Sequence, residues 1–143
     1  MNRITLALAL GAAFAAGCLV MHFSKPAPVE AAQQQVFEMR TYYTLPGRLP
    51  ALQARFRNHT TKLFEKHGMK NVGYWVPMDA PKSENTLIYI LGHKDRDAAK
   101  KSWDAFRNDP DWKTAQKASE ADGKIVEKVE SVFMSPTDYS KIQ

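Results

Sequence analysis

The sequence predicts an α+β domain, in which a four-stranded antiparallel sheet carries helices on one face. Segments rich in β-branched and aromatic residues alternate with segments whose apolar residues recur every three or four positions, in the order strand, helix, strand, strand, helix, strand. The length of 143 residues suits one domain of ordinary size. Hydrophobic residues make up 44% and charged residues 24%, a balance that excludes disorder along the whole chain.

The first strand is predicted over residues 36–44 because this segment is rich in β-branched and aromatic residues. A Leu45-Pro46-Gly47 turn ends it, and a helix follows, for which Gly68 is the expected C-terminal stop. One apolar stripe runs along this helix, formed by Leu49, Leu52, Phe56, Leu63 and Phe64.

The second and third strands are predicted over residues 70–77 and 86–91, separated by a polar loop at residues 79–85. The third strand is nearly continuously apolar, which is typical of a strand buried on both faces.

The second helix is predicted to begin at an Asp95 cap. Asp109 followed by Pro110 predicts the start of a short extra helix. The last strand is predicted over residues 128–135. Helical spacing assigns core packing to Trp103, Phe106 and Trp112.

This order of elements is the ferredoxin-like β-α-β-β-α-β arrangement, with helices on one face of the sheet. The other face would then expose a large apolar surface to water. A second copy packed sheet to sheet is the simplest cover, because two-fold homodimers are the commonest oligomers. We therefore predict a homodimer.

The N-terminal residues predict an export signal, and hence a periplasmic or extracellular protein. Arg3 precedes an apolar run at residues 4–23, which is long enough to remain in a bilayer as a signal anchor. Residues 1–31 are therefore a signal peptide or signal anchor with the start of a linker, 32–35 the rest of the linker, and 36–143 the folded domain.

The sequence allows several ways of processing the signal segment. Cleavage can follow Ala31 or occur near Ala13-Phe14-Ala15, because both sites offer small residues. Ala15-Ala16-Gly17-Cys18 resembles a lipoprotein signal with Ala where Leu is usual, which makes Cys18 a candidate for lipidation. Cys18 is also the one cysteine of the chain, so no intrachain disulfide can form.

Several motifs, taken in order, resemble the NIPSNAP family over about residues 36–137. They are the Phe37–Gly47 opening, His67-Gly68, Gly73-Tyr74-Trp75, the apolar 87–91 strand, and Arg96, Trp103, Phe106 and Asp109-Pro110-Asp111-Trp112. The resemblance implies a dimeric α/β barrel, in which two sheets face each other around a cavity. Related dimeric barrels include cofactor-free oxygenases, isomerases and haem enzymes, so the fold does not select a function.

The first strand carries the candidate binding group. Alternation places Glu38, Arg40 and Tyr42 on one face. The resemblance implies that this face looks into the dimer cavity, where Arg would pair with a carboxylate and Tyr would donate a hydrogen bond. The alternative is an ion pair between Glu38 and Arg40 across the dimer interface, with Tyr42 packed beside it, that only stabilises the structure.

The remaining pocket candidates are aromatic residues and one histidine. Tyr74, Trp75 and Tyr89 would form apolar walls or belong to the core. His93 would edge the pocket or lie on the surface of a turn.

No metal site and no cofactor are predicted. His59 and His67 lack the i, i+4 spacing of a metal-chelating helix, although haem would need only one histidine. The net charge is +5, and we interpret the basic residues of the first helix as a solvated face near lipid headgroups rather than a nucleic-acid site. These basic residues are Arg48, Arg55, Arg57, Lys62, Lys66 and Lys70. Apart from that, membrane contact is expected through the N-terminal segment alone.

Two functions remain open. The first is an exported homodimer that binds a small apolar or amphipathic ligand or a partner. The second is a cofactor-free oxygenase or isomerase acting on a small aromatic compound. In that case Glu38 or His93 would be the base, and Arg40 and Tyr42 would stabilise an anionic oxygen. The sequence contains no catalytic motif that decides between these two functions.

Overall fold

The computed structural model describes residues 35–142. Its sheet has the strand order β2-β3-β1-β4, and each neighbouring pair is antiparallel. The strands are β1 (Val36–Thr44), β2 (Lys70–Trp75), β3 (Thr86–His93) and β4 (Val126–Met134). This is the predicted ferredoxin-like order, with β1 and β3 in the centre and β2 and β4 at the edges.

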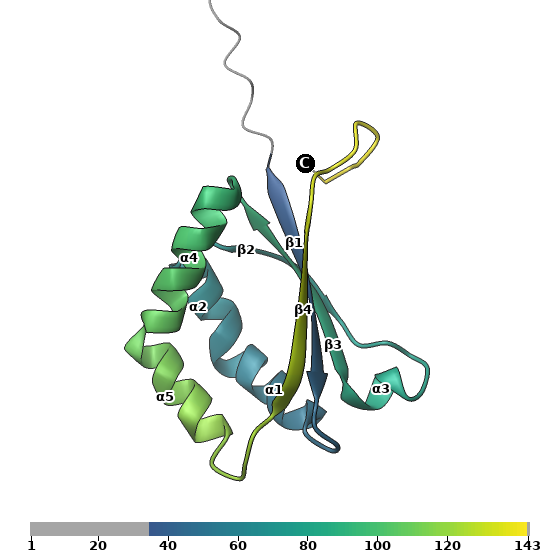
Figure 1. The fold of residues 1–143 in the computed structure, drawn as a ribbon, viewed down its shortest axis with the longest axis vertical. Helices are drawn as coiled ribbons and strands as arrows, with labels where there is room; N and C mark the ends of the chain where they lie inside the picture. Colours follow the sequence, from purple (N-terminus) through teal and green to yellow (C-terminus); the bar gives the residue numbers. More distant parts are fainter. Residues whose placement is uncertain (1–34, 143) are drawn as a thin grey trace, which may run out of the picture.

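The long helices cover one face of the sheet, as Figure 1 shows and as the sequence predicts. One helical run is built from α1 (Leu49–Arg55), the π-helical turn η1 (Phe56–Thr60) and α2 (Thr61–Lys66). A second helical run on the same face of the sheet consists of α4 (Arg96–Asn108) and α5 (Pro110–Ser119). The short α3 (Lys82–Asn85) lies on the β2–β3 connection, away from the other helices (Figure 1).

The helix ends follow the predicted capping residues. The Asp95 side chain accepts a hydrogen bond from the Ala98 amide, and the Asp109 side chain accepts one from the Asp111 amide. Both caps satisfy amides that have no partner within their helix. Gly68 has a φ of 75°, the left-handed conformation that a helix C-terminus favours in glycine.

Two regions differ most from the sequence prediction, the first helix and residues 79–93. A π-helical turn interrupts the first helix, where the Thr60 hydroxyl donates to the Arg55 carbonyl at 3.2 Å. The polar segment predicted as a loop contains α3, and β3 extends to His93. Hydropathy does not report either feature, because both depend on backbone hydrogen bonding rather than on burial.

The core lies between the sheet and the helices, and aromatic rings dominate it. Phe64, which is 1% exposed, is central. Its ring centroid lies 4.9 Å from that of Phe106, 5.4 Å from Trp103 and 5.8 Å from Tyr89. These contacts join α2, α4 and β3 through one side chain.

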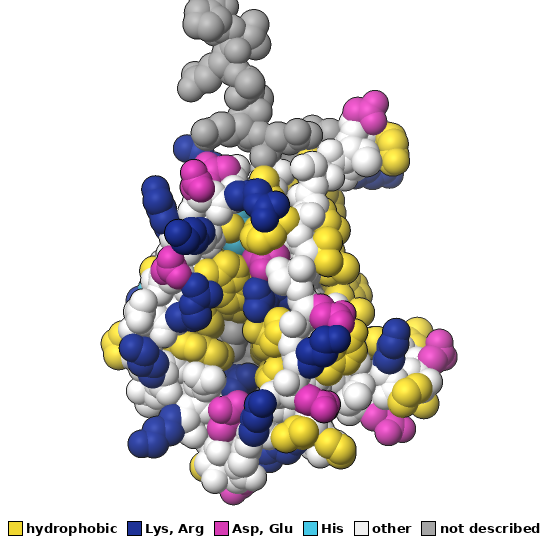
Figure 2. Space-filling view, viewed as in Figure 1, with side chains coloured by type: hydrophobic (Ala, Val, Ile, Leu, Met, Phe, Trp, Pro, Cys, Tyr) yellow, Lys and Arg dark blue, Asp and Glu magenta, His cyan; other side chains and the backbone are white. Residues whose placement is uncertain are grey.

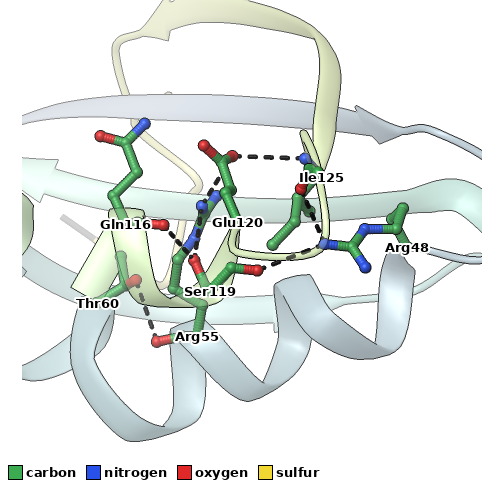
Figure 3. A network of polar contacts seen from close by, with 8 residues as sticks. Arg48, Arg55, Thr60, Gln116, Ser119, Glu120 and Ile125 are labelled. Atoms are coloured by element: carbon green, nitrogen blue, oxygen red, sulfur yellow. Dashed lines mark hydrogen bonds and ion pairs between the residues drawn. The ribbon is translucent and has the colours of Figure 1, made fainter. Parts of the chain in front are cut away.

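Two arginines hold α5 against α1, as Figure 3 shows. Arg48 Nη2 donates to the Gly123 carbonyl at 2.9 Å, and Arg55 Nη1 lies 3.3 Å from both Ser119 Oγ and Glu120 Oε1. Arg55 is 4% exposed. The prediction of a solvated basic face is therefore wrong for Arg55, because its guanidinium satisfies polar groups between two packed helices.

The opposite face of the sheet has no described helix over it. Ile88 and Ile90 of β3 are half-buried there, while Val132 of β4 is 50% exposed. The prediction that the third strand is buried on both faces is wrong for the single chain, because the helices cover only one face. On the other face, residues of the 135–142 segment lie beside Phe37 and Ile90 at one end of the sheet. The apolar content of this strand instead produces an apolar open face.

We expect Phe64→Ala to lower the free energy of unfolding by about 3–5 kcal/mol, because it leaves a cavity where three elements meet. Urea unfolding followed by circular dichroism measures this loss. Lys62→Ala, at an exposed position of α2, is the control and should change stability by less than about 0.5 kcal/mol. Equal effects of the two substitutions would contradict the central position of Phe64.

Candidate functional site

The predicted polar group of β1 faces the helices, not the open face. In the register of the sheet, Arg40 lies opposite Tyr89 of β3. Because cross-strand partners share a face, Glu38, Arg40 and Tyr42 lie on the side of Tyr89, which is fully buried in the core. The expectation that this group looks into a cavity between two sheets is therefore wrong.

Glu38 is the centre of the site. Its side chain is 2% exposed and meets a donor at each of four positions. Oε1 accepts hydrogen bonds from Arg40 Nη1 at 2.7 Å and Ser131 Oγ at 2.6 Å. Oε2 accepts one from Trp103 Nε1 at 2.6 Å and lies 3.2 Å from His93 Nε2. Residues from β1, β3, β4 and α4 thus meet at one carboxylate.

These hydrogen bonds keep the carboxylate ionised. Burial by itself raises the pKa of Glu38, but the hydrogen bonds from its partners outweigh burial and lower the pKa from 4.5 to about 2. A carboxylate with so low a pKa, and with two donors at each oxygen, is a weak proton acceptor. Its role is to hold the groups around it in place.

Arg40 lies between this carboxylate and solvent. Its guanidinium carbon is 4.3 Å from the centroid of the Trp103 indole, a cation–π distance, and its side chain is 18% exposed. Burial lowers the pKa of Arg40, but Tyr89, Tyr42 and the Glu38 carboxylate raise it by more than burial lowers it. The net effect is a raised pKa, so the guanidinium stays protonated. Arg40 Nε is buried without a hydrogen-bond partner.

A tyrosine hydroxyl is buried near Arg40. The Tyr89 ring is packed 5.4 Å from Tyr42 and 5.5 Å from Tyr74. Burial raises the pKa of Tyr89 well above its ordinary value, and the neighbouring Tyr42 raises it as well. The Tyr89 hydroxyl has no partner of good hydrogen-bond geometry. Buried donors of this kind are usually satisfied, and the Nε atoms of Arg48 and Arg55, near α5, also lack a partner.

A cleft gives access to these groups between α4 and β4. Of the β4 residues on the helix-facing side, Val129 is 39% exposed, Ser131 is exposed and Phe133 is half-buried. Figure 2 looks into this gap, where an acidic and a basic group lie among hydrophobic atoms. The helices seal β3 but leave this side of β4 open.

The other predicted pocket residues lie apart from this cleft, and two of them, Tyr74 and Trp75, line a different pocket beside Phe56 and Leu87. His93 is 2% exposed at the end of β3, so its placement on the surface of a turn is wrong, because Glu38 holds it inside. Its Nδ1 has no partner. Tyr74 packs in the core and its hydroxyl donates to Asn71 Oδ1. Trp75 is 50% exposed and covers Gly73, so it does not line the cleft.

Two members of the site are not among the sequence candidates. Trp103 is predicted as core packing, and it is core, but its indole N–H also donates to Glu38. Ser131 carries no signal in the sequence at all. The unpaired N–H of a buried tryptophan requires a partner, which is the one sequence-level sign that Trp103 has a polar neighbour.

Within residues 35–142, no group of three or more His, Cys, Asp or Glu is placed to hold a metal ion. His67 contacts Asp109 at 2.6 Å, and His59 lies exposed on η1. In the same part of the chain, no helix is long and apolar enough to cross a membrane. The predicted signal, the linker and Cys18 lie outside the described residues.

Comparison with known proteins shows the family of this chain. The NIPSNAP family model matches residues 37–141. The chain belongs to the NIPSNAP family. No match was found among proteins of curated function.

Three solved structures illustrate the likeness of fold. A NIPSNAP family protein with unknown function (Atu4242) from Agrobacterium tumefaciens is 22% identical, with a TM-score of 0.67 over 78% of this chain and 96% of that one. A monooxygenase, ActVA-Orf6 of Streptomyces coelicolor, solved with nanaomycin D, is 12% identical, with a TM-score of 0.53 over 82% and 100%. SnoaB, a cofactor-independent oxygenase from Streptomyces nogalater, is 14% identical, with a TM-score of 0.50 over 77% and 99%.

The pKa of Glu38 predicts a pH-dependent stability. A carboxyl group whose folded pKa is lowered stabilises the fold above its ordinary pKa of 4.5 and loses that effect as the pH falls through about 2. We expect Glu38→Gln to lower the free energy of unfolding at pH 7 by about 3 kcal/mol. The difference from the unsubstituted protein should shrink as the pH falls from about 5 to 2.

Urea unfolding at several pH values measures that difference. Glu65→Gln, an exposed carboxyl on α2, serves as the control and should show a small difference at every pH. A loss in Glu38→Gln that is the same at pH 6 and pH 3 would contradict the lowered pKa.

Proposed function

We propose that this NIPSNAP domain is an exported homodimer that binds a small amphipathic ligand in the cleft between α4 and β4. The observation that carries the proposal is the position of Arg40. Its charged, partly exposed guanidinium is paired with the buried Glu38 carboxylate, and apolar side chains surround the guanidinium. Ligand pockets typically combine apolar walls with a few polar groups that are held in place in this way.

Binding is better supported than catalysis because the site lacks a suitable base. The pKa of Glu38 is about 2, and its two oxygens already face four donors. The ring of His93 is 1% exposed and lies behind that carboxylate. A ligand that enters the cleft therefore meets a fixed donor, Arg40, rather than a group ready to remove a proton.

The homodimer is supported by the open face of the sheet. Met39, Ile88 and Ile90 form an apolar surface with Val132, and the described helices lie on the other side. An apolar surface of this kind is commonly buried by a second copy. Export is supported by the sequence of residues 1–31, which leaves cleavage, a retained anchor and lipidation at Cys18 as its three forms.

The alternative is a cofactor-free oxygenase that acts on a small aromatic compound. The specific observation in its favour is the shared fold with ActVA-Orf6 and SnoaB, together with Arg40 in a cleft. A phenol can react through its keto tautomer, in which the ring CH2 group and O2 give a quinone carbonyl and water, so that no added reductant is needed. In such a step Arg40 would stabilise the substrate anion, in place of the base role assigned to Glu38 from sequence.

A test of the cleft uses 1-hydroxy-2-naphthoate as the probe. We expect Val129→Trp to weaken its binding at least about tenfold, because a larger side chain at the cleft mouth excludes the ring. Fluorescence titration measures binding, and Lys62→Trp on the far helix is the control. Mass spectrometry and O2 uptake should show the probe unchanged. O2-dependent turnover that Val129→Trp abolishes would favour the alternative, and no binding at all would contradict both.

A test of the homodimer compares two valines of β4 that point to opposite faces. We expect Val132→Asp to raise the dimer dissociation constant about a hundredfold, because it places a charge in the apolar interface. Val129→Asp, on the helix-facing side, is the matched control and should remain dimeric. Sedimentation over a range of concentrations measures both. If the protein without substitutions is monomeric at micromolar concentration, the proposed homodimer is contradicted.

A further inference from the structure

We propose that the cleft between α4 and β4 selects anions, and that its ligand is an aromatic acid that presents a carboxylate or phenolate oxygen to Arg40. This inference rests on the proposed binding function and names the chemical class of its ligand. It follows from which hydrogen-bonding groups of the site are used and which are left over.

The acceptor at the site is already saturated. A carboxylate has about four positions for donors, and Glu38 has a neighbour at each of them. Its side chain is also 2% exposed, beneath Arg40. A ligand ammonium or amide N–H therefore has no free carboxylate oxygen to bind, although the site contains a negative charge.

The unused capacity at the mouth of the cleft is that of a donor. Arg40 donates to Glu38 through Nη1, and its side chain is 18% exposed, so other donors of the guanidinium remain within reach of a ligand. A guanidinium can only donate, and it stays charged, so the group that completes the site is an oxygen acceptor, best matched by an anion.

The charges on α4 favour the same sign of ligand. Arg96, Lys100 and Arg107 share one side of the helix with Trp103, because the four positions fall within about 60° at 100° per residue. That side faces β4, since the Arg96 guanidinium carbon lies 4.4 Å from the Phe133 ring centroid. Figure 2 shows basic side chains along this helix.

One carboxylate on α4 reduces this positive potential. Asp104 forms an ion pair with Arg107, which leaves Arg96 and Lys100 as the net positive groups of the rim. Such a rim raises the local concentration of anions and the rate at which they arrive.

The walls of the cleft account for the aromatic part of the ligand. Around Arg40 they consist of Trp103 and Tyr42, with Phe133 and Val129 on the β4 side. The Phe133 and Val129 side chains are partly exposed in the single chain, so a ring that enters would remove apolar surface from water. A small inorganic anion would accept hydrogen bonds from the donors but leave this apolar surface exposed to water.

Three probes of equal shape test the selectivity on the protein without substitutions. They are 1-naphthoate, 1-naphthalenemethanol and 1-naphthylmethylammonium, which carry a negative, a neutral and a positive group on one ring system. By calorimetry at pH 7, we expect the acid to bind at least about tenfold tighter than the alcohol, and the ammonium to bind weakest. Raising the salt concentration should weaken the acid alone.

Variants assign the selectivity to Arg40. Arg40→Gln should lower the affinity for naphthoate about ten- to a hundredfold and leave the alcohol within about threefold. Arg40→Lys keeps the charge, so it should retain the order acid over ammonium even if Arg40→Gln does not fold. Arg57→Gln, an exposed arginine on η1, is the matched control and should bind all three probes as the unsubstituted protein does.

The outcomes separate this inference from the proposed function. If the ammonium or the alcohol binds as tightly as the acid and Val129→Trp still blocks binding, the cleft is a binding site but not an anion site. If Arg57→Gln lowers naphthoate affinity as much as Arg40→Gln, the acid binds elsewhere and the inference is overturned. If none of the probes binds, the proposed function and this inference both fall.

Discussion

The structure depends on one buried charge, the Glu38 carboxylate. Isolated carboxylates are very unfavourable in a protein interior, and this one is tolerated because donors from β1, β3, β4 and α4 surround it. The same contacts tie the edge strand β4 and the helix α4 to the centre of the sheet. The polar group therefore specifies the packing of the elements as well as the chemistry of the cleft.

The arrangement also explains how an aromatic core can border the proposed binding cleft. Phe64, Tyr89 and Trp103 form continuous aromatic packing on the β3 side, where the helices seal the sheet. At β4 the helices no longer cover the strand, and Val129 and Ser131 are exposed. Arg40 stands at the boundary between the two regions, close enough to the core to be held and close enough to solvent to be reached.

Sequence reasoning located the polar group but not its surroundings. Alternation along β1 correctly put Glu38, Arg40 and Tyr42 on one face, because the two-residue period of a strand is a local property. Which face meets the helices depends on the register with β3, and this brings Arg40 opposite Tyr89. Trp103 and Ser131 lie 65 and 93 residues from Glu38 along the chain, and no local pattern reports contacts of that range.

The sequence by itself determined the order of strands and helices, the helix caps at Asp95 and Asp109 and the glycine stop at Gly68, because hydropathic period and backbone preference act over a few residues. It also determined the family, through motifs that recur in a fixed order. Only the tertiary structure decided that the acid of β1 is buried and hydrogen-bonded by four side chains, that His93 is interior, and that the cleft opens beside β4. Burial and hydrogen-bond saturation set these properties, and both arise from segments that meet only after the sheet has formed.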